Sequence, residues 1–68
     1  MNFGKNLKNL RNGNNKFEKK FSQQQIASVT GLSRSIISEY ENSIKEPTIS
    51  AALKLADFFE ISLDELCR

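Results

Sequence analysis

The stretch that decides the fold runs from Gln23 to Ser35 and reads QQQIASVTGLSRS. Both of its ends look helical, and they are joined abruptly at Gly31. Glycine adopts positive φ angles without steric cost, so it often stands where a chain turns sharply out of a helix. Ser33 can cap a new helix, because its hydroxyl accepts hydrogen bonds from the free amides of the first turn. The stretch therefore predicts two helices joined by a turn of three residues.

The start of the helix before this turn is marked by a capping box. Ser22 to Gln25 has the S-x-x-Q pattern of such a box, and Phe21 and Ile26 are placed to pack across it as a hydrophobic staple. With a start here and an exit at Gly31, the helix spans about two turns.

The helix after the turn, expected to run through Asn42, has two different faces. At about 100° per residue, Ile36, Ile37 and Tyr40 cluster on one arc. The opposite arc carries Arg34, Ser35, Ser38, Glu39 and Asn42. A solvated surface more often carries long lysines and glutamates than short polar side chains. The polar arc is therefore typical of a helix that approaches a partner closely, while the apolar arc packs on the rest of the chain.

Outward from this stretch, the other regular segments also read as helices. Phe3, Leu7 and Leu10 share one face of a first helix that ends near an Asn-Gly turn signal at residues 12–13. Pro47 and Thr48 open a fourth helix. The apolar stripe of that fourth helix is predicted to be Ile49, Leu53 and Ala56, and it continues to the region of Phe59 or Glu60.

A second capping box, S-x-x-E at Ser62 to Glu65, predicts a short fifth helix at the end of the chain. No run alternates with period two over the length of a strand. At 68 residues the chain has room for one domain at most. We therefore expect an all-α fold, a compact five-helix domain over residues 1–68.

Composition and charge narrow the class. With 38% hydrophobic and 26% charged residues the chain is in the ordinary globular range. Residues 1–20 carry six cations against one anion, +5, and residues 21–68 carry four against seven, −3. Such asymmetry indicates either a polyanion partner or a solvated lysine-rich surface. The single cysteine cannot form an internal disulfide, so nothing indicates an oxidising compartment. No long apolar stretch indicates a signal peptide or a membrane span. We therefore expect the protein in the cytoplasm.

Two helices joined by a short turn that contains a glycine form a helix-turn-helix motif, which we expect at about residues 22–42. The second helix of such a motif enters the major groove of DNA. Ser22 to Glu41, SQQQIASVTGLSRSIISEYE, resembles the phage-repressor and Cro-like family of DNA-binding domains, often called XRE-type. The likeness continues through Pro47, Leu53, Ala56 and ISLDEL at 61–66, and LKNLR at 7–11 resembles the family's first helix. The resemblance implies a lambda-repressor-like domain.

The resemblance also implies roles for individual residues. The positions that face the bases are Arg34, Ser35, Ser38 and Glu39, and those that contact phosphate are Gln23, Ser33, Asn42 and Lys45. Arginine pairs most favourably with guanine, through two hydrogen bonds. Alternatives stay open, namely helix capping for Gln23 and Ser33 and a solvated side chain for Arg34. Arg11 and Glu41 match a structural pair that joins the first helix to the end of the third.

Two departures from the family pattern stand out. Ten residues, Asn12 to Phe21, lie where relatives have about half as many. They are either a surface insertion or a source of extra phosphate contacts through Lys16, Lys19 and Lys20. Ser43 and Glu60 replace glycines that are common in relatives, so a left-handed backbone there would be strained.

The C-terminal end, at about residues 58–68, gathers the apolar side chains Phe58, Ile61, Leu63 and Cys67. The resemblance implies that these residues form a homodimer interface, and the alternative is that Phe58 completes the core of a monomer. A twofold dimer would set two recognition helices about 34 Å apart on a near-palindromic operator.

These features predict a sequence-specific DNA-binding regulator, a repressor that blocks polymerase at its operator. The alternative is a protein-binding module of antitoxin or anti-repressor type on the same scaffold. An enzyme is not expected, because the chain has no histidine, no evident base near Cys67, no phosphate-binding loop and no metal-ligand spacing. We accordingly predict no cofactor, no metal, no small-molecule ligand and no membrane.

Overall fold

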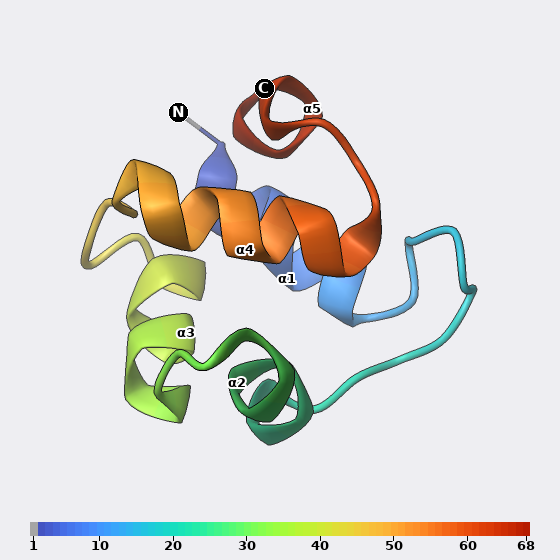
Figure 1. The fold of residues 1–68 in the computed structure, drawn as a ribbon, viewed down its shortest axis with the longest axis horizontal. Coiled ribbons are helices and arrows are strands. Elements are labelled where there is room, and N and C mark those ends of the chain that lie inside the picture. The colour runs from blue at the N-terminus through green and yellow to red at the C-terminus, as the bar shows by residue number, and fades with distance from the viewer. Residues whose placement is uncertain (1) are drawn as a thin grey trace.

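The computed structural model describes residues 2–68, and within that range it contains five helices and no strand. The helices are α1 (Phe3–Arg11), α2 (Gln23–Thr30), α3 (Arg34–Glu41), α4 (Ile49–Phe59) and α5 (Leu63–Cys67). α1 contacts α3 and α5, α2 contacts α3 and α4, and α4 contacts α5 (Figure 1). The predicted all-α class and the five helices are confirmed. No helix within residues 2–68 has both the length and the apolar character needed to cross a membrane.

The last four helices each begin at a residue whose hydroxyl accepts a hydrogen bond from the amide three positions later. The caps are Ser22, Ser33, Thr48 and Ser62, with distances of 3.0, 3.1, 3.1 and 3.1 Å. At Ser22 the box is complete, because the Ser22 amide also donates to Oε1 of Gln25 at 2.7 Å. Each such cap stabilises its helix by about 1 kcal/mol. The helix starts are therefore encoded locally.

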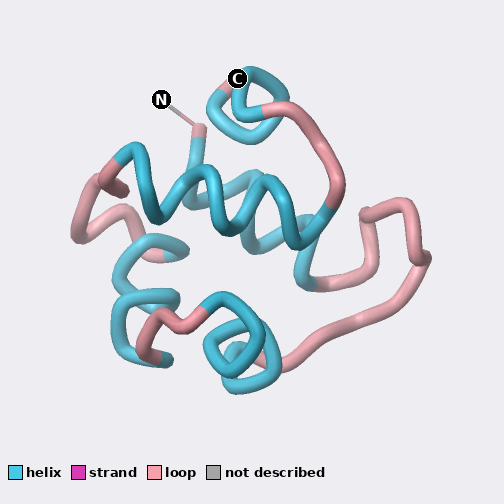
Figure 2. Tube along the Cα trace, viewed as in Figure 1, coloured by secondary structure: helices cyan, strands magenta, loops and turns pink. Residues whose placement is uncertain are grey.

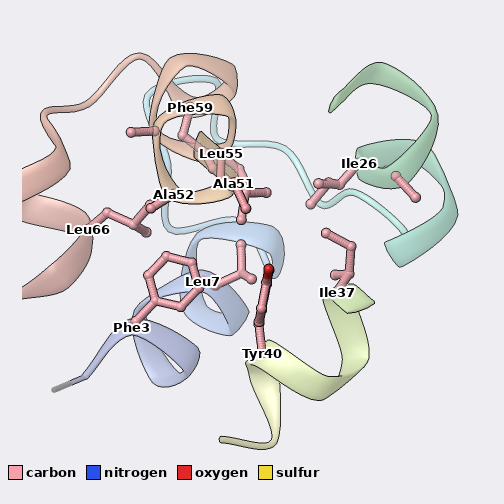
Figure 3. Close-up of a cluster of buried hydrophobic side chains, with 12 residues drawn as sticks. Phe3, Leu7, Ile26, Ile37, Tyr40, Ala51, Ala52, Leu55, Phe59 and Leu66 are labelled. Carbon is pink, nitrogen blue, oxygen red and sulfur yellow. The ribbon is translucent and has the colours of Figure 1, made fainter. Parts of the chain in front are cut away.

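The core draws on every helix (Figure 3). The largest fully buried side chains are Leu7 of α1, Ile26 of α2, Ile37 of α3, Leu55 and Phe59 of α4, and Leu66 of α5. Helices of this length are marginal alone in water, so each owes most of its stability to this shared burial. Because a chain this small buries only a modest part of its surface, loss of any one helix would expose much of the core.

The predicted apolar stripe of α4 is wrong in its first half. Ala56 and Phe59 are buried, but Ile49 and Leu53 are 74% and 45% exposed. The face that packs inward consists of Ala51, Ala52, Leu55, Ala56 and Phe59. Both sets have helical spacing, so periodicity alone did not decide between them. The observed face combines alanines with large side chains, and α4 packs against both α2 and α5.

The long connection between α1 and α2 is a folded loop (Figure 2). The amide nitrogen of the Asn15 side chain donates to the carbonyl oxygens of Leu10 at 2.6 Å and Lys19 at 2.9 Å, and its Oδ1 accepts from the Phe17 amide at 2.9 Å. Where the loop ends, the Phe21 amide donates to the Arg11 carbonyl at 2.9 Å. The two ends of the insertion are thus held together.

Ser43 and Glu60 both adopt left-handed backbone conformations, with φ of 58° and 56°. Ser43 follows the C-terminus of α3, and Glu60 is the C-cap of α4. The turns that glycine usually makes in relatives are therefore kept by residues that carry a Cβ, at a cost of about 1 kcal/mol or more each.

Candidate nucleic-acid interface

The turn between α2 and α3 is built as the sequence predicts. Gly31 caps α2 with φ of 77°, and its amide donates to the Ala27 carbonyl at 2.9 Å. A Cβ at Gly31 would meet nothing within 4 Å, so the backbone angle and not a lack of space favours glycine here. Ser33 then returns to an extended conformation and caps α3. The chain therefore turns from one helix into the next within three residues.

The two faces of α3 are confirmed. Ile37 and Tyr40 are buried, and Ile36 is half-buried. On the other face Arg34, Ser35 and Asn42 are exposed, and Ser38 and Glu39 are partly exposed. The polar face is therefore not covered by the chain's own residues.

Gln23 and three residues of α3 line one shallow depression. The α3 residues are Arg34, Ser35 and Ser38. This brings a residue predicted to contact phosphate beside three predicted to face the bases. The depression offers an amide, a guanidinium and two hydroxyls, which between them can donate to and accept from a nucleic acid.

The alternative role of helix capping applies to Ser33 but not to Gln23. The Ser33 hydroxyl does cap α3, and its own proton stays available for donation. Gln23 does not cap α2, because Ser22 fills that role; instead its Nε2 donates to Oε1 of Glu41 at 3.1 Å. No local pattern could have indicated this bond, since the two residues are 18 positions apart.

Two further predicted contact residues pair with neighbours on the same surface. The Asn42 side-chain amide donates to the Ser38 hydroxyl at 3.4 Å. Nζ of Lys45 lies 3.8 Å from Oε1 of Glu39. An exposed ion pair of this kind contributes about 0 to 1 kcal/mol. The effect of this pair is electrostatic, because Lys45 offsets the negative charge that Glu39 would present to phosphates.

Behind the polar face, Arg11 and Glu41 form the predicted pair. Nε and Nη2 of Arg11 donate to the two carboxylate oxygens at 2.6 and 2.9 Å, and the side chains are 17% and 3% exposed. The hydrogen bonds to Glu41 raise the pKa of Arg11 above its ordinary value, against the opposing effect of burial. The stabilisation is therefore fully present below the ordinary pKa of arginine and is lost only at still more alkaline pH. With Gln23 also bound to Glu41, this network joins α1, α2 and α3.

The four residues predicted at the dimer interface do not form one free patch. All four are half-buried and pack against the chain's own core; they are Phe58, Ile61, Leu63 and Cys67. The Phe58 ring lies edge-on to those of Phe21 and Phe59, at 5.1 and 4.9 Å between centroids. Ile61 borders a separate depression beside α1. These placements leave the dimer as a prediction.

A family model described as helix-turn-helix matches residues 7–66. The chain belongs to the helix-turn-helix family. The match includes both helices of the motif, the turn at Gly31 and the Arg11–Glu41 network behind them. In helix-turn-helix domains the second helix of the motif lies in the major groove, and that helix is α3 here.

The chain is also similar to the transcriptional repressor RstR of the cryptic phage CTXphi from Vibrio cholerae serotype O1. The two are 41% identical over 46 residues, which are 68% of this chain and 41% of the repressor. The aligned residues thus span less than half the length of that relative. No solved structure matches the chain.

Proposed function

We propose that the chain is a sequence-specific DNA-binding regulator of transcription and that it acts as a repressor in the cytoplasm. The observation that carries this proposal is the polar face of α3, which is open to solvent while the opposite face is held in the core. Membership in the helix-turn-helix family and the similarity to a phage repressor support it.

Arg34 is the residue on which base recognition depends in this proposal. It lies in the first turn of α3, it is exposed, and within residues 2–68 no carboxylate oxygen lies within 4.0 Å of its guanidinium. An unpaired guanidinium can donate two parallel hydrogen bonds to O6 and N7 of guanine. Ser35 and Ser38 are short enough to let the helix approach, and Glu39 can accept from the amino group of cytosine.

Contacts to phosphate complete the interface. In this proposal they come from Gln23, Ser33, Asn42 and Lys45, which border the base-reading face. Phosphate contacts set the orientation of the protein but carry no sequence information directly. Gln23 is tied to Glu41, so a phosphate bound by its amide would be held in a constant position relative to α3.

We propose that two copies bind together, with half-sites about 34 Å apart on a near-palindromic operator that overlaps a promoter. The C-terminal residues Ile61, Leu63 and Cys67 remain the proposed contact between copies, whereas Phe58 packs against Phe21 and Phe59 and is not needed for that contact in this proposal. Occupancy of the operator would then exclude polymerase.

Selection of bound sequences from a pool of random duplexes tests the proposal. The wild-type chain is expected to select a preferred half-site. Arg34→Ala is expected to lose discrimination at one base pair per half-site by roughly 5- to 150-fold, because one bidentate contact is removed. Salt-dependent binding to non-selected DNA should persist, because the phosphate contacts remain.

Arg68→Ala is the matched control, since Arg68 is an exposed arginine on the C-terminal side of α5. It removes the same charge and should leave the selected sequence unchanged. An Arg34→Ala chain that selects the same half-site as the wild type would refute direct readout by Arg34. A wild-type chain that enriches no sequence would refute the proposed function itself.

A further inference from the structure

Two apolar depressions meet on the side of the molecule that carries the insertion. One is lined by Phe17, Lys19, Phe21 and Phe58, and the other by Phe21, Ser22, Gln24, Gln25, Ser28, Val29 and Phe58. They adjoin one another at Phe21 and Phe58, which line both, and together we call them the aromatic groove. It extends from the α1–α2 loop, past the end of α4, to the outer face of α2. None of its residues lies on α3.

The aromatic groove is held in shape by a chain of edge-to-face rings. Phe17 lies 6.2 Å from Phe21, Phe21 lies 5.1 Å from Phe58, and Phe58 lies 4.9 Å from Phe59, with interplanar angles of 77° to 87°. Phe59 is fully buried, so the series is anchored in the core. Such ring pairs add about 0.5–1.5 kcal/mol each beyond simple burial. The groove is therefore formed before any partner arrives.

The insertion, residues 12–21, holds Phe17 in a fixed position at the surface. Asn15 orders the loop around it through three hydrogen bonds, and Phe17 is still 43% exposed. At the other end of the groove Val29 is 70% exposed. Contiguous apolar side chains in contact with water are unfavourable, and patches of this kind commonly mark interaction sites.

The charges around the groove define what it would accept. Lys19 is the one charged residue among those that line the groove, and its Nζ lies 5.8 Å from the centroid of the Phe21 ring. The charged residues next to the lining in sequence have both signs, because Glu18 and Lys20 flank Lys19 and Asp57 precedes Phe58, but none of these three lines the groove. Within residues 2–68 neither lysine has a carboxylate within 4.0 Å, although Lys16 is paired with Glu60 at 2.6 Å. The N-terminus of α2 at Ser22 adds a partial positive charge. An occupant should thus carry apolar side chains and negative charge.

We propose that the aromatic groove binds an acidic amphipathic helix of a partner protein. A second copy of this chain fits less well, because the same surface of the other copy carries Lys19 and no lining carboxylate to pair with it. DNA could accept from the polar side chains at the α2 edge of the groove, but it would leave the apolar surface of Phe17, Phe58 and Val29 without an apolar partner. Helices that place apolar side chains at i, i+4 and i+7 into apolar grooves are a common mode of protein recognition.

The probe is a synthetic amphipathic peptide of about four helical turns, with leucines on one face and glutamates on the others. Its binding to the full chain is followed by fluorescence anisotropy and by amide chemical shifts. We expect the shifts to gather at Phe17, Lys19, Phe21, Val29 and Phe58. Phe17→Ser should weaken binding by at least about tenfold, and Lys19→Glu by about fivefold.

Matched controls separate the groove from general effects. Leu53→Ser removes an apolar side chain elsewhere that is 45% exposed, against 43% for Phe17, and Lys5→Glu makes the same charge change on α1; neither should alter peptide binding by more than about twofold. A scrambled peptide of the same composition should bind more weakly. Thermal melting of Phe17→Ser, together with a second variant, Val29→Ser, distinguishes a lost contact from a lost fold.

Three results would overturn the proposal. The first is no binding of the peptide up to about 1 mM, or equal binding by the wild type and by both serine variants. The second is self-association in sedimentation that Phe17→Ser abolishes, which would assign the groove to a second copy. The third is a loss of DNA binding in Phe17→Ser with peptide binding unchanged, which would assign the groove to nucleic acid. Failure of the proposed DNA-binding function alone would leave these readouts unaffected.

Discussion

At the scale of single residues, Gly4 shows how closely the helices approach. A Cβ built at this position would lie 2.2 Å from the carbonyl oxygen of Tyr40 and 3.3 Å from that of Glu41. Glycine inside a helix costs about 1 kcal/mol relative to alanine, so its use here needs a compensating contact. That contact is the passage of α1 against the end of α3, where the rings of Phe3 and Tyr40 also meet edge-on at 5.5 Å.

Gly4→Ala is therefore expected to destabilise the domain by about 1–3 kcal/mol, although alanine is the better helix former. The clash is with backbone, which cannot rotate away as a side chain can. Denaturant unfolding measures the change. Asn9→Ala, on an exposed position of the same helix, should stay within about 0.5 kcal/mol of the wild type. A Gly4→Ala chain as stable as the Asn9→Ala control would show that α1 shifts without cost.

At the scale of elements, the three N-terminal helices are joined by one polar network. Glu41 of α3 accepts two hydrogen bonds from Arg11 of α1 and one from Gln23 of α2. Arg11 also binds the Phe21 carbonyl at 3.4 Å, where the insertion ends. The network thus links the insertion and the start of α2 to the helix proposed to read DNA.

Removing only one member of this network should lower the free energy of unfolding. Arg11→Met is expected to lower the free energy of unfolding by about 3–5 kcal/mol, because it leaves the buried carboxylate of Glu41 without its cation. The double variant Arg11→Met with Glu41→Leu should be more stable than Arg11→Met alone, since no buried charge remains. Unfolding monitored by circular dichroism checks both. Similar losses in the single and double variants would mean that the pair is not coupled.

At the scale of the whole molecule, the first and last helices, α1 and α5, lie side by side (Figure 1). The Asn6 side chain of α1 donates to the carbonyl oxygens of Leu66 and Arg68 at 2.9 and 3.1 Å, which fastens α5 to α1. The polar face of α3, which is proposed to read DNA, lies away from α5, because the main contacts of α3 are with α1 and α2. A second copy could therefore meet the C-terminal end without covering α3.

Sedimentation tests the proposed homodimer. The wild-type chain should be dimeric at micromolar concentration, and Leu63→Ser should shift it toward monomer, because the variant removes apolar area at the contact between copies. Ile49→Ser, which removes an exposed apolar residue from another face, should leave the dimer intact. A wild-type chain that stays monomeric well above micromolar concentration would contradict the dimer.

The sequence by itself determined the five helices and where the last four of them begin. Each hydroxyl cap bonds an amide three residues along the chain, and the positive φ of Gly31 belongs to one residue, so neither depends on distant contacts. The polar and apolar faces of α3 also followed from spacing alone. The Arg11–Glu41 pair was expected only through the family resemblance, and the structure confirms it.

The tertiary structure alone decided which face of α4 is buried, because two overlapping apolar stripes with helical spacing compete and only packing against the other helices chooses between them. It also decided that Gln23 binds Glu41 and that Phe17 joins Phe58 in one groove. These pairs are far apart in sequence, and their contact depends on how whole helices and the insertion are placed. The physical reason is the sequence separation between the groups that interact. Caps and turns depend on residues that are neighbours in the chain, whereas burial and long-range contacts depend on the assembled core.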